Sequence, residues 1–261
     1  MNNNILKRVT VLLLIRIIMV VSFQLLLALV LSREKAMPWW PFSLIATETL
    51  CFVILILLLK KENKPFRSIQ LLPFETSLPL GKISYFLNKK PSKNNITNFI
   101  KDAVLFIVLL LILGVPAIML NGFINQNIPI LRDTKIIGIL PGWAPWLMIV
   151  LLPMAQALIE FPWFYGYLYP RLETYFEKNS GKRRIIASII ALSICLAFFI
   201  IQAALVPLIL NPYYTLWRAI SFVPLLLVIG IIIRLVPRFM IGANILHAVL
   251  AINVVLQYWK I

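Results

Sequence analysis

The stretch Ala157-Leu-Ile-Glu-Phe-Pro-Trp-Phe-Tyr-Gly-Tyr-Leu-Tyr-Pro-Arg-Leu-Glu173 places a single carboxylate, Glu160, inside a long apolar run. The run is long enough to cross a bilayer, which takes about 20 mostly apolar residues. An ionised side chain in hydrocarbon costs roughly 3 kcal/mol or more, so such residues generally mark a functional site. Glu160 is therefore the first candidate functional residue of the chain.

The composition places the whole chain among membrane proteins. Of its 261 residues 61% are hydrophobic, and the mean hydropathy is +0.94, whereas soluble domains are about 45–50% apolar. The net charge of +16 does not favour nucleic acid, because the basic residues cluster in the short segments between apolar runs and form no continuous soluble face. We expect a lipid bilayer as partner and no nucleic acid.

The fold class follows from the spacing of the apolar runs. Without an internal repeat, they predict one domain over 1–261, an all-α, polytopic, integral-membrane helical bundle. The first run exceeds the apolar core of about 7–15 residues of a signal peptide, so it is expected to be retained. The seven predicted spans are 10–32, 42–59, 103–120, 143–168, 185–210, 216–235 and 240–258.

The distribution of basic residues predicts the orientation. With a cytoplasmic N-terminus, the inside segments hold 18 of the 25 Lys and Arg, and the outside segments hold 6. The positive-inside rule therefore favours N-in and C-out. The inside segment 60–102 is rich in lysine and contains apolar groups separated by prolines. It either lies along the inner headgroups, near anionic lipid, or forms a solvated basic loop.

Two other charged residues fall within predicted spans, Arg16 and Glu48. Counted at about 1.5 Å per residue from the predicted ends of their spans, they lie about 12 Å apart in depth. We therefore expect them not to pair and each to act alone near an interface. Cys51 and Cys195 lie in apolar runs without the spacing of metal ligands, and neither a metal nor a cofactor is predicted.

The segment from Glu160 to Leu172 resembles the signature of the CPBP family, which comprises CAAX-prenyl endopeptidases and bacteriocin-processing or immunity proteins. In that family of polytopic helical membrane proteins the motif is Glu-Glu-x-x-x-Arg, usually followed by Gly. Glu160 matches the first, catalytic glutamate, whereas Phe161 and Tyr165 stand where the second glutamate and the arginine belong. The resemblance is strongest over 140–258.

Two later motifs of the family follow in the right order. Phe-x-x-x-His matches Phe198 to Gln202, with Gln202 in place of histidine, and His-x-x-x-Asn matches His247 to Ala251, with Ala251 in place of asparagine. In the family the glutamate and a histidine activate a water and the asparagine helps to hold the oxyanion. The resemblance thus implies catalytic roles for Glu160, His247 and Gln202, although a carboxamide cannot exchange a proton with water.

The same resemblance implies a substrate-binding group. Asn244 lies one turn before His247 and is a hypothetical replacement for the missing amide. Trp143 and Trp146 are better explained as part of an aromatic belt at the membrane interface. The predicted substrate-binding residues are Tyr165, Phe198, Asn244 and Trp163.

Helix geometry places Glu160 and His247 at similar depths, about 12 and 10 Å from the cytoplasmic ends of their spans. Gln202 joins them only if the first turns of its helix lie outside the bilayer. Each residue also has a plain structural interpretation, because a lone polar side chain on an apolar helix often serves as an interhelical hydrogen-bond partner.

Two functions remain open at this point. The first is a catalytically impaired or inactive CPBP relative in a bacterial plasma membrane, which binds a membrane-embedded peptide or protein partner in bacteriocin self-immunity or envelope regulation. The second is an active, divergent, glutamate-dependent intramembrane endopeptidase. A small-solute transporter is disfavoured, because the sequence lacks paired half-helices and inverted repeats.

Overall fold

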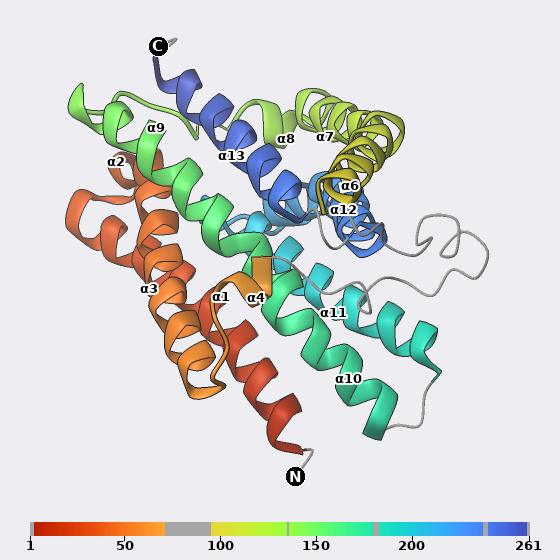
Figure 1. Cartoon of the computed structure of the whole chain (residues 1–261). Coiled ribbons are helices and arrows are strands. Elements are labelled where there is room, and N and C mark those ends of the chain that lie inside the picture. Colours follow the sequence, from red (N-terminus) through yellow and green to blue (C-terminus); the bar gives the residue numbers. More distant parts are fainter. Residues whose placement is uncertain (1–2, 71–94, 135, 180–182, 237–239, 260–261) are drawn as a thin grey trace.

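The computed structural model describes residues 3–70, 95–134, 136–179, 183–236 and 240–259, which form helices and no strand (Figure 1). In chain order these helices are α1 (Asn3–Leu31), α2 (Arg33–Ala36), η1 (Met37–Trp39), α3 (Trp40–Lys61), α4 (Arg67–Gln70), α6 (Asn95–Leu109), η3 (Leu110–Gly114), α7 (Val115–Asn127), α8 (Pro129–Arg132), α9 (Trp143–Ala155), η4 (Gln156–Glu160), η5 (Pro162–Leu168), α10 (Tyr169–Asn179), α11 (Arg184–Ala204), α12 (Pro212–Leu235), α13 (Met240–Leu256) and η7 (Gln257–Trp259).

The predicted all-α polytopic bundle is confirmed. Within the described residues, seven helical stretches are long and apolar enough to cross a membrane: Ile5–Leu31, Arg33–Lys61, Phe99–Asn127, Trp143–Lys178, Arg184–Ala204, Pro212–Leu235 and Met240–Trp259. The spans differ from their predicted ends by up to ten residues: the second begins at Arg33 and not at 42, and the third continues to Asn127 and not 120. The fourth continues well past residue 168, and the fifth ends at Ala204 because residues 205–211, which include Pro207, are not helical.

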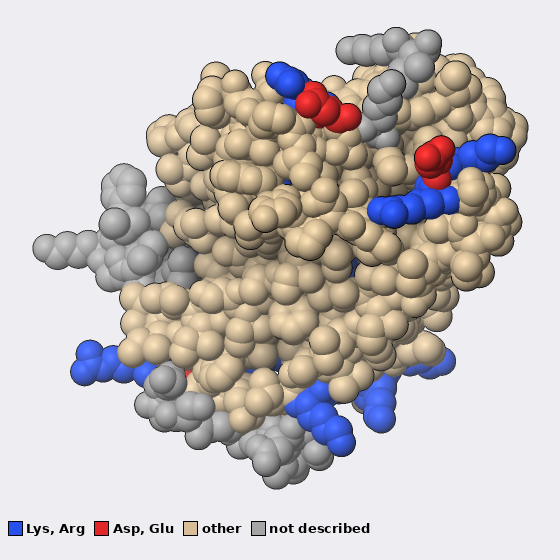
Figure 2. Space-filling view, turned by 180° about the vertical axis from the view of Figure 1, so that it is seen from behind, with Lys and Arg blue, Asp and Glu red and all other residues tan. Residues whose placement is uncertain are grey.

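The surface is organised as a membrane protein requires. On the face drawn in Figure 2, the charged side chains gather at two opposite ends of the molecule, and the broad band between them is almost entirely uncharged. Large apolar side chains such as Leu29, Leu111 and Trp146 are exposed within the spans, where lipid would cover them. The two termini lie at opposite ends of the bundle (Figure 1), as an odd number of crossings demands. The N-in orientation stays a prediction.

The fourth span is the central element of the bundle. It consists of α9, η4, η5 and α10, and it packs against α1, α3, α11 and α13. Its middle is π-helical over Gln156–Glu160 and again over Pro162–Leu168, and every side chain of the second stretch is buried. Pro162 has no N–H, so it removes one backbone bond of a regular helix, and π-helical turns are frequent at functional sites. Glu160 therefore sits in the least regular part of the most enclosed helix.

The predicted segment 60–102 is described only at its two ends. Residues 71–94 lie outside the described part, and with them the choice between an interfacial and a solvated segment. The first part turns back on the bundle: Phe66 is partly buried, and Ile69 of α4 is 3% exposed and contacts η5. The opening turn of this segment is thus a packed element of the fold.

A cluster of ionic contacts holds the end of α3 to the fourth span. The carboxylate of Glu62 pairs with Arg171, accepts a hydrogen bond from the Tyr167 hydroxyl at 2.8 Å and lies 3.3 Å from Arg8. Partial burial raises the pKa of the Glu62 carboxyl, but Arg171, Tyr167 and Arg8 together outweigh that effect, and the net pKa lies below the ordinary value of 4.5.

This lowered pKa predicts a pH-dependent contribution to stability. The contribution of Glu62 is present above pH 4.5, where the carboxyl is ionised in the folded and unfolded states, and is lost as the pH falls through the folded-state pKa. Glu62→Gln should lower the thermal stability of the detergent-solubilised protein at pH 7 by less than about 1 kcal/mol, because the cluster is partly exposed. The difference from wild type should shrink as the pH is lowered below 4.5.

Arg171→Gln serves as the matched variant for this measurement. The double variant should lose less stability than the sum of the two single variants, because both remove the Glu62–Arg171 pair. A wild-type to Glu62→Gln difference that is unchanged from pH 7 to pH 3 would contradict the prediction.

Candidate functional site

The predicted meeting of Glu160 and His247 is confirmed. His247 Nε2 of α13 lies 3.1 Å from Glu160 Oε2, and the imidazole stacks on the Phe161 ring at a centroid distance of 4.4 Å. The fourth and seventh spans run side by side along α9 and η4, which brings the two residues to one level. Glu160 is 3% exposed, so this contact is made in the interior of the bundle.

Gln202 joins the same carboxylate from the fifth span. Its Nε2 donates to Glu160 Oε1 at 2.7 Å, and its side chain is buried. Glu160 lies 19 residues before the last residue of α10, Asn179, and Gln202 lies 18 residues after the first residue of α11, Arg184. Residues equidistant from the turn of an antiparallel helix pair lie at the same level. α11 packs along α10, and Ser188 near its start contacts Tyr169, whereas the position of these first turns outside the bilayer stays a prediction.

Arg16 and Glu48 are also part of this site, and the expectation that they stay apart is wrong. Arg16 Nη1 donates to Glu48 Oε2 at 2.9 Å and Nη2 donates to the other carboxylate oxygen. Both residues are sixteen positions from Ser32, whose positive φ of 68° lies at the turn between the first two spans. The depth estimate failed because both spans extend beyond their predicted ends, whereas distance from the turn places the two residues level with each other.

These five side chains form one buried network. Arg16 Nη2 also reaches Glu160 Oε1 at 3.4 Å, and Arg16 Nε donates to Gln202 Oε1 at 2.5 Å. The Gln202 carboxamide therefore accepts from the cation and donates to the acid at the same time. The guanidinium carbon lies 5.2 Å from the centroid of the Phe164 ring. One cation thus sits between two carboxyl groups in an interior where an unpaired charge would be strongly destabilising.

This arrangement limits what Glu160 can do as a base. Its Oε1 faces donors from Gln202 and Arg16, and its Oε2 faces His247. A general base must lie within hydrogen-bond reach of the proton it abstracts, either directly or through one water. These donors take three of the roughly four acceptor positions of the carboxylate, and Glu160 is only 3% exposed, so a substrate water reaches it only if the bundle opens.

The predicted substrate-binding residues do not form one group. The Tyr165 hydroxyl points to the carbonyl of Leu226 at 3.4 Å, and Trp163 is fully buried with Arg16 5.8 Å from its ring centroid. Phe198 packs at the edge of the core, whereas its neighbour Phe199 contacts Phe161 and Phe164. These aromatic side chains therefore pack around the network.

Asn244 is the exception among them. Its Nδ2 donates to Gln70 Oε1 of α4 at 2.6 Å, so it lies where the opening turn of segment 60–102 meets the bundle. Its own Oδ1 is buried without a hydrogen-bond partner, and so is Nδ1 of His247 one turn further along α13. Asn244 is thus linked to the site through α4 and through His247 and not through a contact with Glu160.

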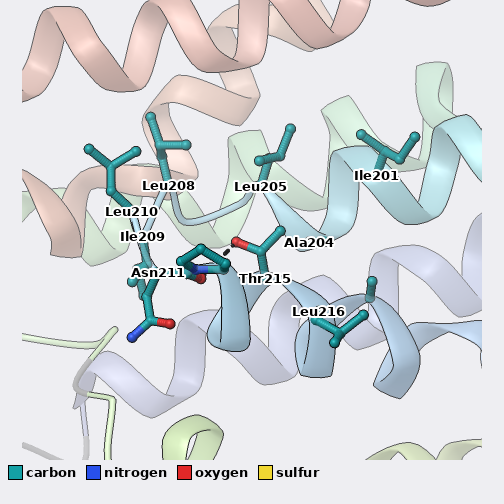
Figure 3. Close-up of a pocket in the computed structure, with 11 residues that line it drawn as sticks. Ile201, Ala204, Leu205, Leu208, Ile209, Leu210, Asn211, Thr215 and Leu216 are labelled. Carbon is teal, nitrogen blue, oxygen red and sulfur yellow. Dashed lines mark hydrogen bonds between the residues drawn. The ribbon is translucent and has the colours of Figure 1, made fainter.

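A cavity of about 660 Å³ lies apart from this network, where α11 ends and α12 begins (Figure 3). Its walls are mainly leucine and isoleucine side chains. Its polar groups are engaged nearby: Asn211 Oδ1 accepts from the N–H groups of Tyr213 and Tyr214, and Thr215 Oγ1 donates to the Asn211 carbonyl at 3.2 Å. None of the described residues that line it is a predicted site residue. The described residues also contain no group of three His, Cys, Asp or Glu side chains placed to hold a metal ion.

Sequence reasoning missed the pairing of Arg16 with Glu48 and the role of Gln70. Arg16 and Glu48 could have been found from their equal distance to Ser32. Gln70 carries no such signal, because it follows a short loop after α3. A second buried pair, Arg234 with Glu173 at 3.1 Å, lies between α12 and α10 and packs on the Tyr169 ring. It was missed because both residues lie near the ends of the predicted spans, where charges are ordinary.

Comparison with protein-family models, curated proteins and solved structures gives no match for this chain.

The network predicts that Arg16 is the most sensitive of these residues. Arg16→Met leaves Glu48 and Glu160 buried without a cation and should cost about 3–5 kcal/mol, seen as loss of monodisperse protein or a large fall in melting temperature. Glu160→Gln removes one of two acids and leaves the Arg16–Glu48 pair balanced, so it should cost far less. Adding Glu48→Leu to Arg16→Met should restore part of the stability.

Arg33→Met is the matched control, because Arg33 is exposed at the start of α2. It should leave the melting temperature nearly unchanged. If Arg16→Met melts within a degree or two of wild type, the network is not a determinant of stability.

Proposed function

We propose that this chain is a multi-pass membrane protein of the CPBP type that binds a membrane-embedded peptide or protein partner and does not hydrolyse it. The observation that carries this proposal is the state of Glu160: the residue that matches the catalytic glutamate is held by Arg16, Gln202 and His247 and is 3% exposed. Such a carboxylate serves as a structural anchor for five spans.

The replaced motif positions point the same way. Phe161, Tyr165, Gln202 and Ala251 stand where the resemblance expects an acid, an arginine, a histidine and an asparagine. Ala251 offers no donor to a developing oxyanion, and the loss of one such donor typically lowers the rate by about 10²–10³. Both polar groups of the Gln202 side chain are already hydrogen-bonded, its oxygen to Arg16 and its nitrogen to Glu160. These changes remove catalytic groups and keep the bundle closed.

The family context supplies the setting of the proposal. A scaffold that once bound a peptide near its glutamate can keep the binding surface after hydrolysis is lost, and a protein of this kind would serve bacteriocin self-immunity or the control of an envelope protein in a bacterial plasma membrane. Binding by shape and hydrogen bonds requires only a surface that is open to the partner.

An active glutamate-dependent intramembrane endopeptidase is the second candidate, and one contact favours it. Glu160 and His247 are 3.1 Å apart, and the imidazole keeps Nδ1 without a partner. An acid and an imidazole in contact, with one ring nitrogen still open, form an arrangement that could activate a water if the bundle opened. This candidate requires the bundle to open during turnover, so that a water and a substrate reach the carboxylate.

The two candidates are separated by reconstituting the purified protein in liposomes with prenylated and unprenylated apolar peptides. We expect no cleavage by wild type above the level of Glu160→Gln and His247→Ala, measured by mass spectrometry of the peptides. A cleavage rate that falls about 10²-fold or more in Glu160→Gln would show the endopeptidase instead. Glu34→Gln, an exposed acid at the start of the second span, is the matched control.

A further inference from the structure

The short helix α4 lies directly on the irregular middle of the fourth span (Figure 1). Its main chain approaches so closely that a Cβ built on Gly166 would lie 2.4 Å from the carbonyl oxygen of Ile69, well inside contact distance. Only glycine permits this approach. Gly166 is therefore the residue over which the main chain of α4 packs, and this steric role is separate from its position in the family motif.

The Gln70 side chain completes the contact with hydrogen bonds on both sides. Its Nε2 donates to the carbonyl of Leu158 at 3.4 Å, and its Oε1 accepts from Asn244 Nδ2 at 2.6 Å. Leu158 lies four residues before Pro162, which has no N–H to offer that carbonyl. The Gln70 carboxamide thus donates to a backbone carbonyl of the fourth span and accepts from a side chain of the seventh.

Among the residues that the structure describes, two buried polar atoms of α13 on this side have no hydrogen-bond partner. They are Oδ1 of Asn244, a residue 4% exposed, and Nδ1 of His247, one turn away on the same face of α13. The Asn244 oxygen is an acceptor, and Nδ1 of His247 is one too when Nε2 carries the proton toward Glu160. A buried acceptor without a donor is destabilising, so this surface is built to receive N–H groups beyond those that α4 provides.

We propose that Leu158, Gly166, Asn244 and His247 form a docking surface for a peptide segment, and that residues 66–70 are its resident occupant. The partner is a short segment with an apolar side chain to match Ile69 and a main chain that passes over Gly166. It carries an acceptor for Asn244 Nδ2, as Gln70 does, and N–H donors for the Leu158 carbonyl, Asn244 Oδ1 and His247 Nδ1. The partner enters from the end of the bundle where α3 ends, at Lys61. This inference rests on the proposed function and identifies where the partner binds.

The resident segment is suited to exchange. It is a single turn of helix, and the described contacts of its Gln70 amount to one long and one normal hydrogen bond. Its remaining affinity comes from Ile69 and Phe66, and a competing peptide can supply the same contacts.

The test uses the resident segment itself as the probe. A fluorescent peptide with the sequence of residues 64–70, Lys-Pro-Phe-Arg-Ser-Ile-Gln, is titrated onto the full chain in lipid nanodiscs and followed by anisotropy. The receiving variant has residues 66–70 replaced by alternating Gly and Ser. It should bind the peptide saturably, and the wild type, whose surface is occupied, at least tenfold more weakly.

Gly166→Val added to the Gly-Ser variant should abolish this binding, because a side chain would fill the place of the Ile69 carbonyl. Gly122→Val is the matched control, since a Cβ at Gly122 meets no atom within 4 Å, and it should leave binding unchanged. Equal affinity of the Gly-Ser variant and the wild type, or binding that survives Gly166→Val, would overturn the proposal.

Gln70→Ala provides a second measurement if the Gly-Ser variant does not fold. It removes both hydrogen bonds of the resident segment and keeps the chain intact, so the peptide should bind it several-fold more tightly than wild type; unchanged affinity counts against the docking surface. Peptide binding to Glu34→Gln, which changes an exposed acid outside the docking surface, should match wild type. Hydrolysis by wild type that depends on Glu160 would refute the binding-only function, whereas absent binding would refute the docking surface alone.

Discussion

The position of Arg16 between two carboxyl groups is the constraint on which the rest of the bundle depends. A guanidinium at this depth has no water to pair with, so its donors must be met by protein. Glu48, Glu160 and Gln202 meet them from three other spans, and His247 adds the seventh span through Glu160. Apolar packing against lipid gives helices little preference for particular neighbours, whereas this network does.

The same constraint decides between the two roles open to Glu160. A buried carboxylate that balances a cation and accepts from a carboxamide is stabilised in its place, and each of these contacts works against its use as a base. Catalysis needs a group whose interactions become stronger in the transition state than in the ground state. Glu160 has its best partners already in the resting bundle. A site of this kind is well suited to fix the geometry of a binding surface.

Much of the fold was predictable, because span number depends on about 20 apolar residues in a row and the seven runs are clear. The contact of Glu160 with His247 was predictable from helix depth and from the motif order. The contact of Arg16 with Glu48 was not predictable, because an error in a predicted span end changes the estimated depth of every residue in that span. The first and second spans are both longer than the apolar runs from which they were predicted. The packing of α4 on Gly166 was not predictable for another reason. Gly166 is part of the family motif, and its steric role is seen only when the position of Ile69 is known.

The backbone of the fourth span connects the network to the docking surface. Irregular helix at membrane depth is stable only where protein covers the freed polar groups. Pro162 withholds an N–H from the Leu158 carbonyl, two residues from Glu160, and Gln70 of α4 provides the replacement donor. Removing α4 without a substitute would take the donor from that carbonyl and would leave the buried Asn244 Nδ2 without its acceptor. A partner peptide that supplies an equivalent donor and an equivalent acceptor removes this penalty, so the surface should open only in exchange for a ligand and stay closed without one.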